Sequence, residues 1–410
     1  MSWFKTILLT LFLSFVWAAT CVYGGVSGWF LKPIAETGNT EQFIANSQAL
    51  IANNQANIAY VLIENGQVVF QDYSKSKDEI TANTLFPVAS LSKFITAYGV
   101  MSLAEQQQVR LDHAINEQLT GWQLPESEFD NQTVSLAHLL SHTAGLGDGL
   151  GFADIPLNET VPSLLESLNK PLSSTGVREI KVTKPVGDFK YSGGGYLMLE
   201  LLVEEKTNQR FATWMADNVF KPVNMTDASY DVLTELDNIA PAYDKSGQAA
   251  GHFQYASAAA TGLLASSHDL IALVQALTSP QTGQLSPQMI STMRAPLAIS
   301  LGAPIWGLGT MLYAPTASGD FVFGHDGANE PAINSTLRIN PDNNDAIIIL
   351  SSGGEHIASK LGYEWTLWQT GYPDFLAFDV ALQSAFVPCL IGLGIILIGM
   401  IIVRFKKRNK

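Results

Sequence analysis

The sequence predicts an α/β protein of the α+β kind, in which an antiparallel sheet is flanked by terminal helices and carries an inserted, mostly helical lobe. Three observations support this prediction. Strand-like patterns lie near both ends of the polar part of the chain, helical patterns dominate its middle, and a long uncharged run borders each terminus. Strands that a helical insertion separates in sequence can pair in one sheet, and the insertion then forms its own lobe.

The first apolar segment follows Lys5 and contains no charged residue from Thr6 to Leu31. It is long enough to span a bilayer and longer than the apolar core of most cleaved signal peptides. Glycines dilute its second half, so a cleaved signal peptide stays an alternative. We therefore interpret residues 1–32 as a signal anchor or a signal peptide.

The second apolar segment, residues 385–403, is an uncharged run of 19 residues, and residues 404–410 behind it include five Lys or Arg. Charge is excluded from hydrocarbon, and the cytoplasmic flanks of membrane helices are rich in Lys and Arg. This pattern predicts a transmembrane helix with a basic cytoplasmic tail. The main domain would then lie in the periplasm or at the exterior of a bacterial inner (cytoplasmic) membrane.

The charge of the region between these ends restricts its partners. All 37 acidic residues lie there with only 17 of the 23 basic residues, which gives a net charge of −20. Such a domain is repelled by nucleic acid and by anionic lipid. Both cysteines, Cys21 and Cys389, lie in the apolar ends, so the exported domain contains no disulfide.

Residues 33–375 have a size typical of one two-lobed domain. A helical pattern over residues 41–52 precedes two β-rich runs, 59–63 and 68–71. These runs surround Asn65-Gly66, the strongest short signal for a hairpin turn. The first part of the domain therefore contributes a helix and a hairpin.

The middle of the chain predicts a helical lobe inserted between about residues 105 and 300. A buried, apolar helix is expected just before it, over residues 91–103. Within the lobe, a helix is expected over residues 136–142, with Gly145 as its C-terminal cap. A further helical pattern, YLMLELLVEE, begins at Tyr196.

The last part of the domain returns to strands. Residues 321–323, 335–339 and 346–350 are β-rich, and the turn sequence PDNND separates the last two runs. Residues 355–369 then have a helical pattern. Strands from both ends of the domain would thus form one antiparallel sheet with a helix at each end.

A Ser-x-x-Lys tetrad occurs four times, and its surroundings distinguish the copies. The four pairs are Ser2/Lys5, Ser74/Lys77, Ser90/Lys93 and Ser167/Lys170. Ser2 lies in the export segment, Ser74 in a charged run, and Ser167 just before Pro171, where a helix would end. Only Ser90 stands at the entrance to a long apolar helix.

The position of Ser90 has chemical consequences. Residues three apart on a helix share a face, so Lys93 would lie beside Ser90. A helix N-terminus offers free N–H groups and a positive dipole end, which favour an oxyanion. Apolar surroundings would lower the pKa of Lys93, so that its neutral amine accepts the serine proton. The alternative is a serine N-cap with a surface lysine.

Two further motifs favour the catalytic interpretation. Tyr191-Ser192-Gly193 precedes a helical pattern, and residues 324–327 (GHDG) lie between the expected strands 321–323 and 335–339. With them the sequence resembles the class C β-lactamase, D-alanyl-D-alanine carboxypeptidase and esterase group of β-lactamase-related serine hydrolases. The matching segments, in the family's order, are FPVASLSKFITA, LAHLLSHTAGL, FKYSGGGYLMLELL, ASAAATGLLASSHDL and FGHDGANE.

The resemblance covers about residues 40 to 370 and implies a β-lactamase/transpeptidase-like fold. It implies that Ser90 attacks an acyl carbonyl and forms an acyl-enzyme. It implies that Lys93 and Tyr191 carry out the proton transfers. It also places His325 where relatives have a lysine or histidine that orients the tyrosine or an anionic substrate group.

The resemblance further implies an oxyanion hole made of the backbone N–H groups of Ser90 and Ala328, with Gly327 letting substrate lie close to the strand. Gly193 departs from the asparagine that β-lactam-hydrolysing relatives usually carry to contact the substrate amide. Losing that hydrogen bond would cost about 1–3 kcal/mol, which disfavours efficient β-lactam hydrolysis. We also expect activity to fall above neutral pH, because a His325 of ordinary pKa loses its charge near pH 6.5.

The sequence thus predicts a membrane-anchored serine hydrolase acting on an ester, a D-amino-acid peptide or amide, or a β-lactam. The alternative is a non-hydrolytic penicillin-binding or cell-wall-peptide receptor of the same fold, although a tail of seven residues is short for signalling. His138 and His142 have the spacing of a metal pair, but we interpret them as capping and core histidines. No metal or organic cofactor is implied, the partners are an acyl substrate and membrane lipid, and the oligomeric state stays open.

Overall fold

The computed structural model describes residues 3–54, 56–73, 78–150, 152–171, 179–230, 237–279, 283–354 and 356–408. The chain forms two compact units, which we name the central unit, Ile44–Gly362, and the terminal unit, Met1–Phe43 with Tyr363–Lys410. Helices α2 (Thr40–Ala52) and α12 (Ile357–Thr370) each cross from one unit into the other. The Ser74/Lys77 tetrad and Ser2 lie outside the described residues.

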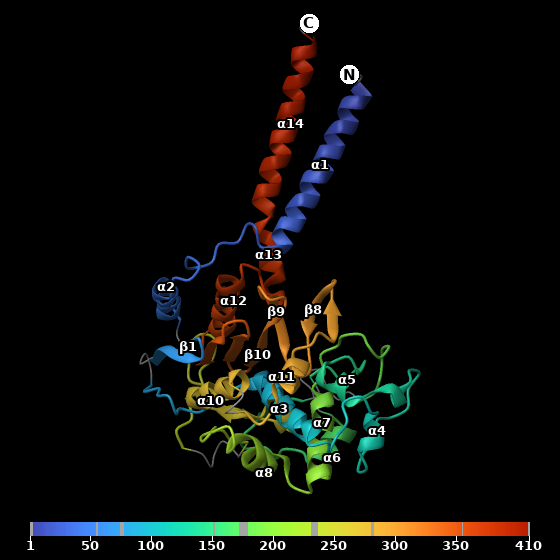
Figure 1. Ribbon diagram of the computed structural model, residues 1–410, viewed down its shortest axis with the longest axis vertical. Coiled ribbons are helices and arrows are strands. Elements are labelled where there is room, and N and C mark those ends of the chain that lie inside the picture. Colours follow the sequence, from blue (N-terminus) through green and yellow to red (C-terminus); the bar gives the residue numbers. More distant parts are fainter. Residues whose placement is uncertain are drawn as a thin grey trace. The chain divides into compact units, whose positions relative to one another are not determined.

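The central unit is built on an eight-stranded antiparallel sheet in the order β2-β1-β12-β11-β10-β9-β8-β7 (Figure 1). Its strands are β1 Asn57–Glu64, β2 Gln67–Tyr73, β7 Ala298–Ser300, β8 Ala303–Trp306, β9 Met311–Pro315, β10 Phe321–Asn329, β11 Ile333–Asn340 and β12 Asp345–Ser352. The first strand of the chain pairs with the last, with Asn57 opposite Ser352. This confirms the prediction that strands from both ends of the domain form one sheet.

Both predicted hairpins are confirmed. In the first, Asn65 and Gly66 have φ values of 50° and 73°, so the turn uses two left-handed residues. Such a turn matches the right-handed twist of the strands, which explains the Asn-Gly pair. The second hairpin joins β11 to β12, with Asn340 opposite Asp345.

The first of these late strands is longer than predicted, because the GHDG segment, expected to lie between two strands, belongs to β10. β10 runs from Phe321 to Asn329, and residues Phe323 to Asn329 pair continuously with β11. A Cβ atom on Gly324 would lie 2.0 Å from the carbonyl oxygen of Leu337, so this glycine permits close backbone approach inside the sheet. His325 and Asp326 consequently point to opposite faces of the sheet.

Helices fill the sequence between β2 and β7, as predicted. They are α3 Ser92–Glu105, α4 Ile115–Gln118, α5 Leu136–Leu140, α6 Leu164–Asn169, α7 Gly194–Thr207, α8 Phe211–Met215, α9 Ala258–Thr261, α10 Ser267–Thr278 and α11 Pro287–Met293. Two short strand pairs accompany them: β3 Phe86–Pro87 with β6 Leu264–Ala265, and β4 Ile155–Pro156 with β5 Phe253–Gln254. Every residue of α3 from Ser92 to Leu103 is buried, so this helix lies in the core of the unit.

The predicted end of the helix over residues 136–142 is wrong. α5 stops at Leu140, and the left-handed residue behind it is His142, with a φ of 57°. The amide of Thr143 donates to the carbonyl of His138 at 2.9 Å, which closes the helix in a Schellman turn. Glycine normally occupies that position, and His142 takes it here.

The terminal unit contains two helices that are long and apolar enough to cross a membrane. They are α1 (Trp3–Val26) and α14 (Phe386–Arg408), which lie side by side and antiparallel, with the short helix α13 (Phe378–Ser384) directly before α14 (Figure 1). Their lengths of 24 and 23 residues exceed the roughly 20 residues that a bilayer requires.

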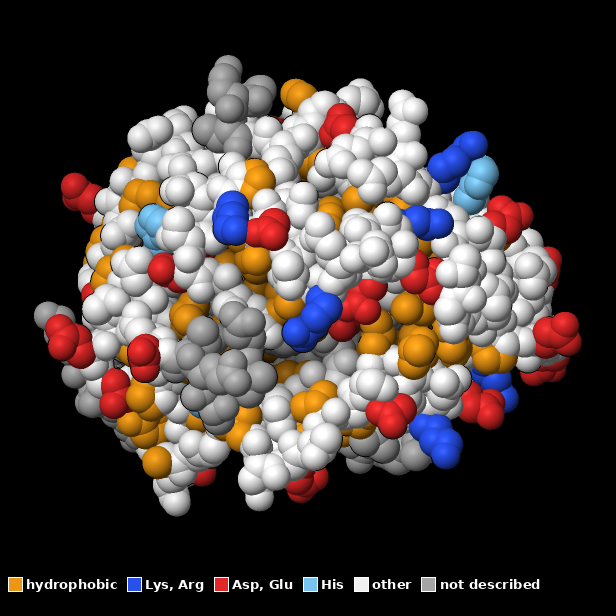
Figure 2. All heavy atoms as spheres, turned by 90° about the horizontal axis from the view of Figure 1, so that it is seen from below, with side chains coloured by type: hydrophobic (Ala, Val, Ile, Leu, Met, Phe, Trp, Pro, Cys, Tyr) orange, Lys and Arg blue, Asp and Glu red, His pale blue; other side chains and the backbone are white. Residues whose placement is uncertain are grey.

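Acidic side chains are dispersed over the face of the molecule that is drawn in Figure 2. In the face that Figure 2 shows, they alternate with basic and polar side chains, and apolar side chains lie in the furrows between them. A face of this kind offers no basic stripe for a nucleic-acid backbone.

Candidate active site

Ser90 lies in a single 3-10 turn, Ala89–Leu91, that leads into α3. Ala89 has a φ of 50°, a left-handed conformation that is strained for alanine. Ser92 holds this turn, because its hydroxyl donates to the carbonyl of Ala89 at 2.7 Å and accepts from the amide of Leu263 at 3.1 Å. Ser335 of β11 donates to Val88 at 2.7 Å on the other side. The half-buried Ser90 is thus fixed by the sheet and by the helical lobe.

Lys93 is fully buried and lies one helical turn beyond Ser90. Its Nζ atom is 3.3 Å from Ser90 Oγ and donates to the carbonyl oxygen of Ala260 at 2.8 Å. Burial lowers the pKa of Lys93 to about 7, although the nearby Asp148 acts in the opposite direction. The amine is therefore present in both protonation states near neutral pH.

Tyr191 completes the group around the serine. Its hydroxyl lies close to the side chain of Ser90, and its ring centroid is 4.9 Å from Lys93 Nζ. Burial raises the pKa of Tyr191, so the phenol keeps its proton at neutral pH. The structure thus brings together Ser90, Lys93 and Tyr191, which the sequence places in two distant segments.

His142 supports Tyr191 from behind. The two rings lie 4.3 Å apart at an interplanar angle of 36°. The Nδ1 atom of His142 accepts the backbone N–H of Ser192 at 3.2 Å, which fixes the backbone next to the tyrosine. Sequence analysis assigned His142 to the core, and the signal it missed is that a histidine takes the glycine position of a helix end.

His325 is fully buried beside Trp306, with ring centroids 5.2 Å apart. Its Nδ1 atom lies 2.5 Å from the carbonyl oxygen of Asp326, so that nitrogen carries the hydrogen. Burial and the nearby Lys93 lower the pKa of His325 to about 3. His325 is therefore neutral from mildly acidic pH upward. The prediction that activity falls above neutral pH because His325 loses its charge is wrong.

Asp148 is a buried carboxylate that the sequence motifs did not identify. It accepts from the Ser192 hydroxyl at 2.7 Å and from the Gly194 amide at 2.8 Å. The second contact lies at the N-terminus of α7, where a carboxylate is favoured by the helix dipole. Asp148 therefore fixes the segment that carries Tyr191.

Glu200 is a second buried carboxyl group that sequence analysis missed. It lies on α7 and accepts the amide of Ala259 at 3.1 Å and also bonds to the amide of Ala258, at the start of α9. Burial raises the pKa of Glu200 to about 8. The same short helix presents the Ala260 carbonyl to Lys93, so Glu200 acts on Lys93 through α9.

The two glycines assigned to substrate contacts lie against protein atoms. A Cβ on Gly193 would be 1.4 Å from the carbonyl oxygen of Leu150, so the Leu150 segment occupies the space of any side chain at position 193. A Cβ on Gly327 would be 2.2 Å from the carbonyl oxygen of Val88, beside the turn that holds Ser90. Gly327 thus lets β10 approach that turn.

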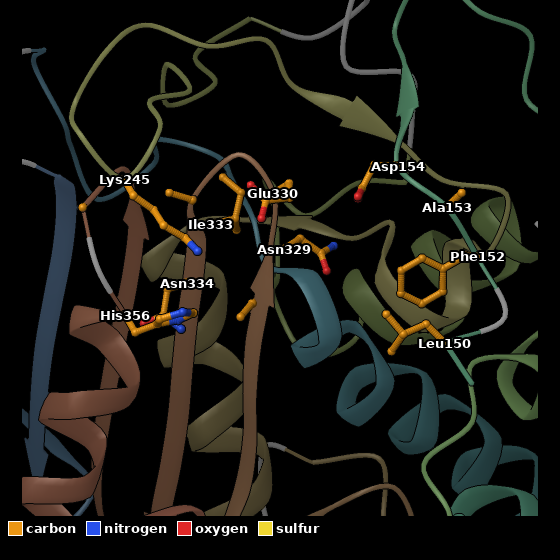
Figure 3. A pocket seen from close by; sticks show the side chains of 13 residues that line it. Leu150, Phe152, Ala153, Asp154, Lys245, Asn329, Glu330, Ile333, Asn334 and His356 are labelled. Atoms are coloured by element: carbon orange, nitrogen blue, oxygen red, sulfur yellow. The ribbon is translucent and has the colours of Figure 1, made fainter. Parts of the chain in front are cut away.

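A cavity of about 330 Å³ lies at the end of β10 (Figure 3). Ala328, the residue assigned to the oxyanion hole, belongs to its wall, together with Asn329 and Glu330 behind it. Phe152 closes the opposite side, and its ring centroid is 5.6 Å from Lys93 Nζ. Ser90, Lys93 and Tyr191 do not line this cavity, and Phe152 and Ala328 are the wall residues that relate it to the serine site.

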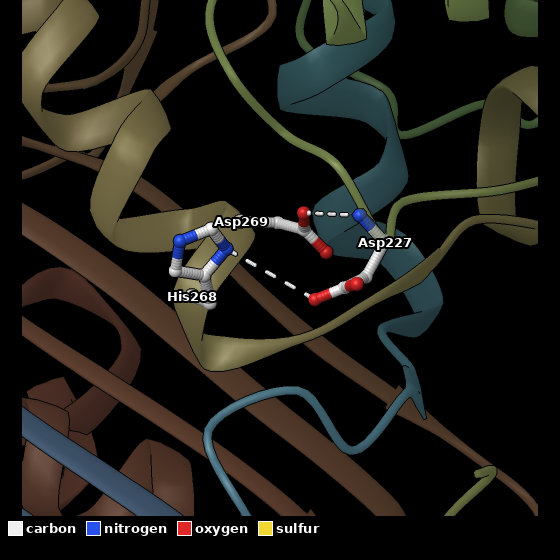
Figure 4. A group of neighbouring side chains, drawn as sticks. All are labelled: Asp227, His268 and Asp269. Carbon is white, nitrogen blue, oxygen red and sulfur yellow. Dashed lines mark hydrogen bonds and ion pairs between the residues drawn. The ribbon is translucent and has the colours of Figure 1, made fainter.

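Asp227, His268 and Asp269 form a separate cluster whose side chains come close enough to hold a metal ion (Figure 4). Asp269 accepts the Ser266 amide at 2.8 Å and the Asp227 amide at 2.9 Å, which caps the start of α10. Asp227 accepts from Asn83 at 2.9 Å. Both carboxylate oxygens of Asp269 and Oδ2 of Asp227 thus already have hydrogen-bond donors, as expected of a helix cap.

A serine at a helix entrance, a buried lysine one turn along and a tyrosine from a second segment are the arrangement typical of active-site-serine hydrolases with the β-lactamase/transpeptidase-like fold. The Beta-lactamase family model matches residues 43–366, and the chain belongs to that family.

Similar proteins agree with this assignment. Penicillin-binding protein 4* of Bacillus subtilis is 30% identical over 158 residues, which are 37% of this chain and 32% of that protein. The match thus spans about a third of the relative's length. The penicillin-binding protein of Bacillus halodurans shares the fold with a TM-score of 0.63, at 18% identity over 76% of this chain and 95% of that one. D-amino acid amidase of Ochrobactrum anthropi has a TM-score of 0.60, at 18% identity over 78% and 96%.

Proposed function

We propose that the chain is a membrane-anchored serine acyl hydrolase that works through an acyl-enzyme on Ser90. The observation that carries this proposal is the 3.3 Å contact between Lys93 Nζ and Ser90 Oγ, made by a buried amine whose pKa is about 7. Such an amine matches the operating pH of a general base.

In the proposed reaction, Lys93 removes the proton of Ser90 as the serine oxygen attacks the acyl carbonyl. The backbone N–H groups of Ser90 and Ala328 stabilise the oxyanion. Tyr191 keeps its proton at neutral pH and so donates it to the leaving group. Water then hydrolyses the acyl-enzyme by the same proton transfers in reverse.

The space beside Gly193 is occupied by the carbonyl oxygen of Leu150, and this bears on which class of acyl substrate the site accepts. Because the carbonyl of Leu150 lies where an asparagine side chain would lie, no amide at that position contacts the substrate. We therefore propose esters and D-amino-acid amides or peptides as substrates ahead of β-lactams. The D-amino acid amidase fold neighbour is consistent with this choice.

A hydrolase is favoured over a non-hydrolytic receptor by Lys93. A receptor needs only acylation, whereas turnover also needs a group that returns the proton to Ser90 during deacylation, and an amine with a pKa of about 7 can both accept and release that proton. We place the central unit outside the cytoplasm of a bacterial inner membrane. Helices α1 and α14 would hold it there, with the basic tail inside.

The test is a substrate panel on the detergent-solubilised full-length protein. Ser90→Ala should abolish hydrolysis of p-nitrophenyl butyrate and D-alanine amide, while Ser167→Ala, in another Ser-x-x-Lys tetrad far along the sequence, should leave it unchanged. Nitrocefin should be hydrolysed slowly or not at all. Equal turnover by Ser90→Ala and wild type would reject the mechanism. Stoichiometric labelling of Ser90 by a fluorophosphonate without turnover of any substrate would support the receptor instead.

A further inference from the structure

The chain has two cysteines, and they lie at opposite ends of the sequence. In the terminal unit the side chains of Cys21 on α1 and Cys389 on α14 lie close to each other. Cys21 is buried and Cys389 is partly buried, and neither is in a disulfide. Apolar helices do not need cysteine in order to pack, so a coincidence of both cysteines at one contact requires an explanation.

The helix pair is in register around this contact. One turn beyond Cys21, a Cβ on Gly25 would lie 3.0 Å from the Cβ of Ala385. One turn before it, the indole N–H of Trp17 donates to the carbonyl oxygen of Cys389 at 3.1 Å. Positions 17, 21 and 25 lie on one face of α1, because residues four apart on a helix share a face.

Small residues bring the two backbones close together. A Cβ on Gly392 would lie 2.0 Å from Trp17 Nε1, so the indole occupies the space that a side chain at position 392 would need. Small residues such as glycine and alanine at facing positions are typical of closely packed membrane helices. Disulfides require Cα atoms within about 4.4–6.8 Å, a separation that only such close packing provides.

We propose that Cys21 and Cys389 are joined by a disulfide in the exported protein, which links its two terminal helices covalently. The two thiols lose two protons and two electrons as the S–S bond forms. A disulfide donor outside the cytoplasm accepts them and leaves as two thiols. This inference uses the acyl hydrolase proposal only for the orientation of the helices in the membrane.

The positions of the cysteines suit such an exchange. Cys21 lies near the C-terminal end of α1, and Cys389 lies near the N-terminal end of α14. With the basic tail in the cytoplasm, both of these helix ends face the outer side of the membrane. The outer side is the oxidising compartment in bacteria. The disulfide also requires that α1 is retained, so the N-terminal segment acts as an anchor and is not removed.

The experiment uses full-length protein in its native membrane, with a site for a sequence-specific protease inserted after Gly38. Free thiols are first blocked with N-ethylmaleimide, the membranes are dissolved in SDS and the protein is cut. The α1 fragment should stay with the rest of the chain without reductant and separate from it after reduction. The control variant Cys21→Ser/Val22→Cys moves the thiol to a side chain that is 57% exposed and should not form the link.

Three outcomes would overturn the proposal. They are separation of the α1 fragment without reductant, absence of residues 1–32 from the mature protein, and linkage in the Val22 variant equal to that in wild type. Ester hydrolysis by the same membranes, compared with Ser90→Ala, reports on the acyl hydrolase proposal separately. If the disulfide is absent, the ester assay still tests the acyl hydrolase proposal. If ester hydrolysis is absent, the protease assay still tests the disulfide.

Discussion

The nitrogen of Lys93 is held between two oxygen atoms, the carbonyl oxygen of Ala260 and Ser90 Oγ. A neutral amine has two N–H groups and one lone pair. The carbonyl of Ala260 accepts one hydrogen at 2.8 Å, and Ser90 Oγ lies 3.3 Å away. Burial favours the neutral form, since a buried cation loses its hydration. The lone pair is then available for the serine proton above the pKa of Lys93.

We expect kcat/KM for an ester to rise with pH through about pH 7 and then to level off. Lys93, with a pKa of about 7, must lose its proton before it acts as a base, so activity below that pH should fall roughly tenfold per pH unit. A pH–rate profile from pH 5 to 9 measures this.

The control for this profile is His325→Gln. The wild-type imidazole, with a pKa of about 3, is already neutral throughout the measured range. The acidic limb should therefore stay at the same pH in the variant, whatever its amplitude. A limb that disappears with the histidine would assign the titration to His325 and would contradict the role of Lys93.

The residue motifs were predictable, but their protonation states were not. Ser90 and Lys93 were identified because only that tetrad precedes an apolar helix, and the structure places their atoms in contact. The charge of His325 was misjudged because a motif does not reveal burial. Asp148 and Glu200 were missed because neither belongs to a recognisable motif, and only the fold shows which backbone amides donate to them.

Helix α9 is an element of four residues that connects two functional side chains. Its first amides donate to Glu200, and its Ala260 carbonyl accepts from Lys93. A single turn of helix has too few internal hydrogen bonds to hold its own position. Glu200 is therefore a positioning residue for the lysine, acting through the backbone of α9.

Replacing Glu200 tests this relation. Glu200→Leu should lower kcat by about tenfold to a hundredfold, because a displaced α9 misplaces the Lys93 amine. Glu200→Gln keeps an oxygen acceptor and should restore most of the rate. The acidic limb of the pH profile should also move in the leucine variant, because the amine loses its fixed partner. Equal kcat values and an unmoved limb in both variants would leave Glu200 with a purely structural role.

The segment around Leu150 is the second element that sets the site. The amide of Gly193 donates to the carbonyl of Gly149 at 3.1 Å, and Asp148 accepts from both Ser192 and Gly194. These hydrogen bonds hold this segment and the Tyr191-Ser192-Gly193 motif together. An asparagine at position 193 would therefore require the neighbouring segment around Leu150 to take a different path.

Gly193→Asn should not create a β-lactamase. The new Cβ would lie 1.4 Å from the carbonyl oxygen of Leu150, so the loop must move, at a cost of about 1–3 kcal/mol for overpacking. We expect a lower melting temperature, slower ester hydrolysis and no gain with nitrocefin. Gly251→Asn is the matched control, because that glycine has open space around its Cβ position, and its melting temperature should be unchanged. A gain in nitrocefin hydrolysis at full stability would contradict this account.

At the scale of the whole molecule, the order of elements was predictable from local signals. Asn65-Gly66 predicted one hairpin, PDNND predicted another, and β-rich runs placed the strands at both ends of the domain. The continuous β10 was not predicted, because Gly324 and Gly327 are typical turn residues, and only the neighbouring backbones show why glycine is needed inside that strand. Contacts between distant segments, such as Leu150 with Gly193, have no local signature.

Membrane attachment is the last property that belongs to the whole chain. Helices α1 and α14 each have the length and hydropathy of a membrane span, and a cluster of cations follows the second. Deleting residues 385–410 should leave the protein membrane-bound through α1. Deleting residues 1–32 as well should release an active, soluble enzyme, because each apolar helix alone supplies enough transfer free energy for insertion. Carbonate extraction followed by an ester assay of both fractions measures this. Full retention of the doubly truncated chain would show that another surface binds the membrane, whereas release after the C-terminal deletion alone would show that α1 is cleaved and would rule out the disulfide between the two helices.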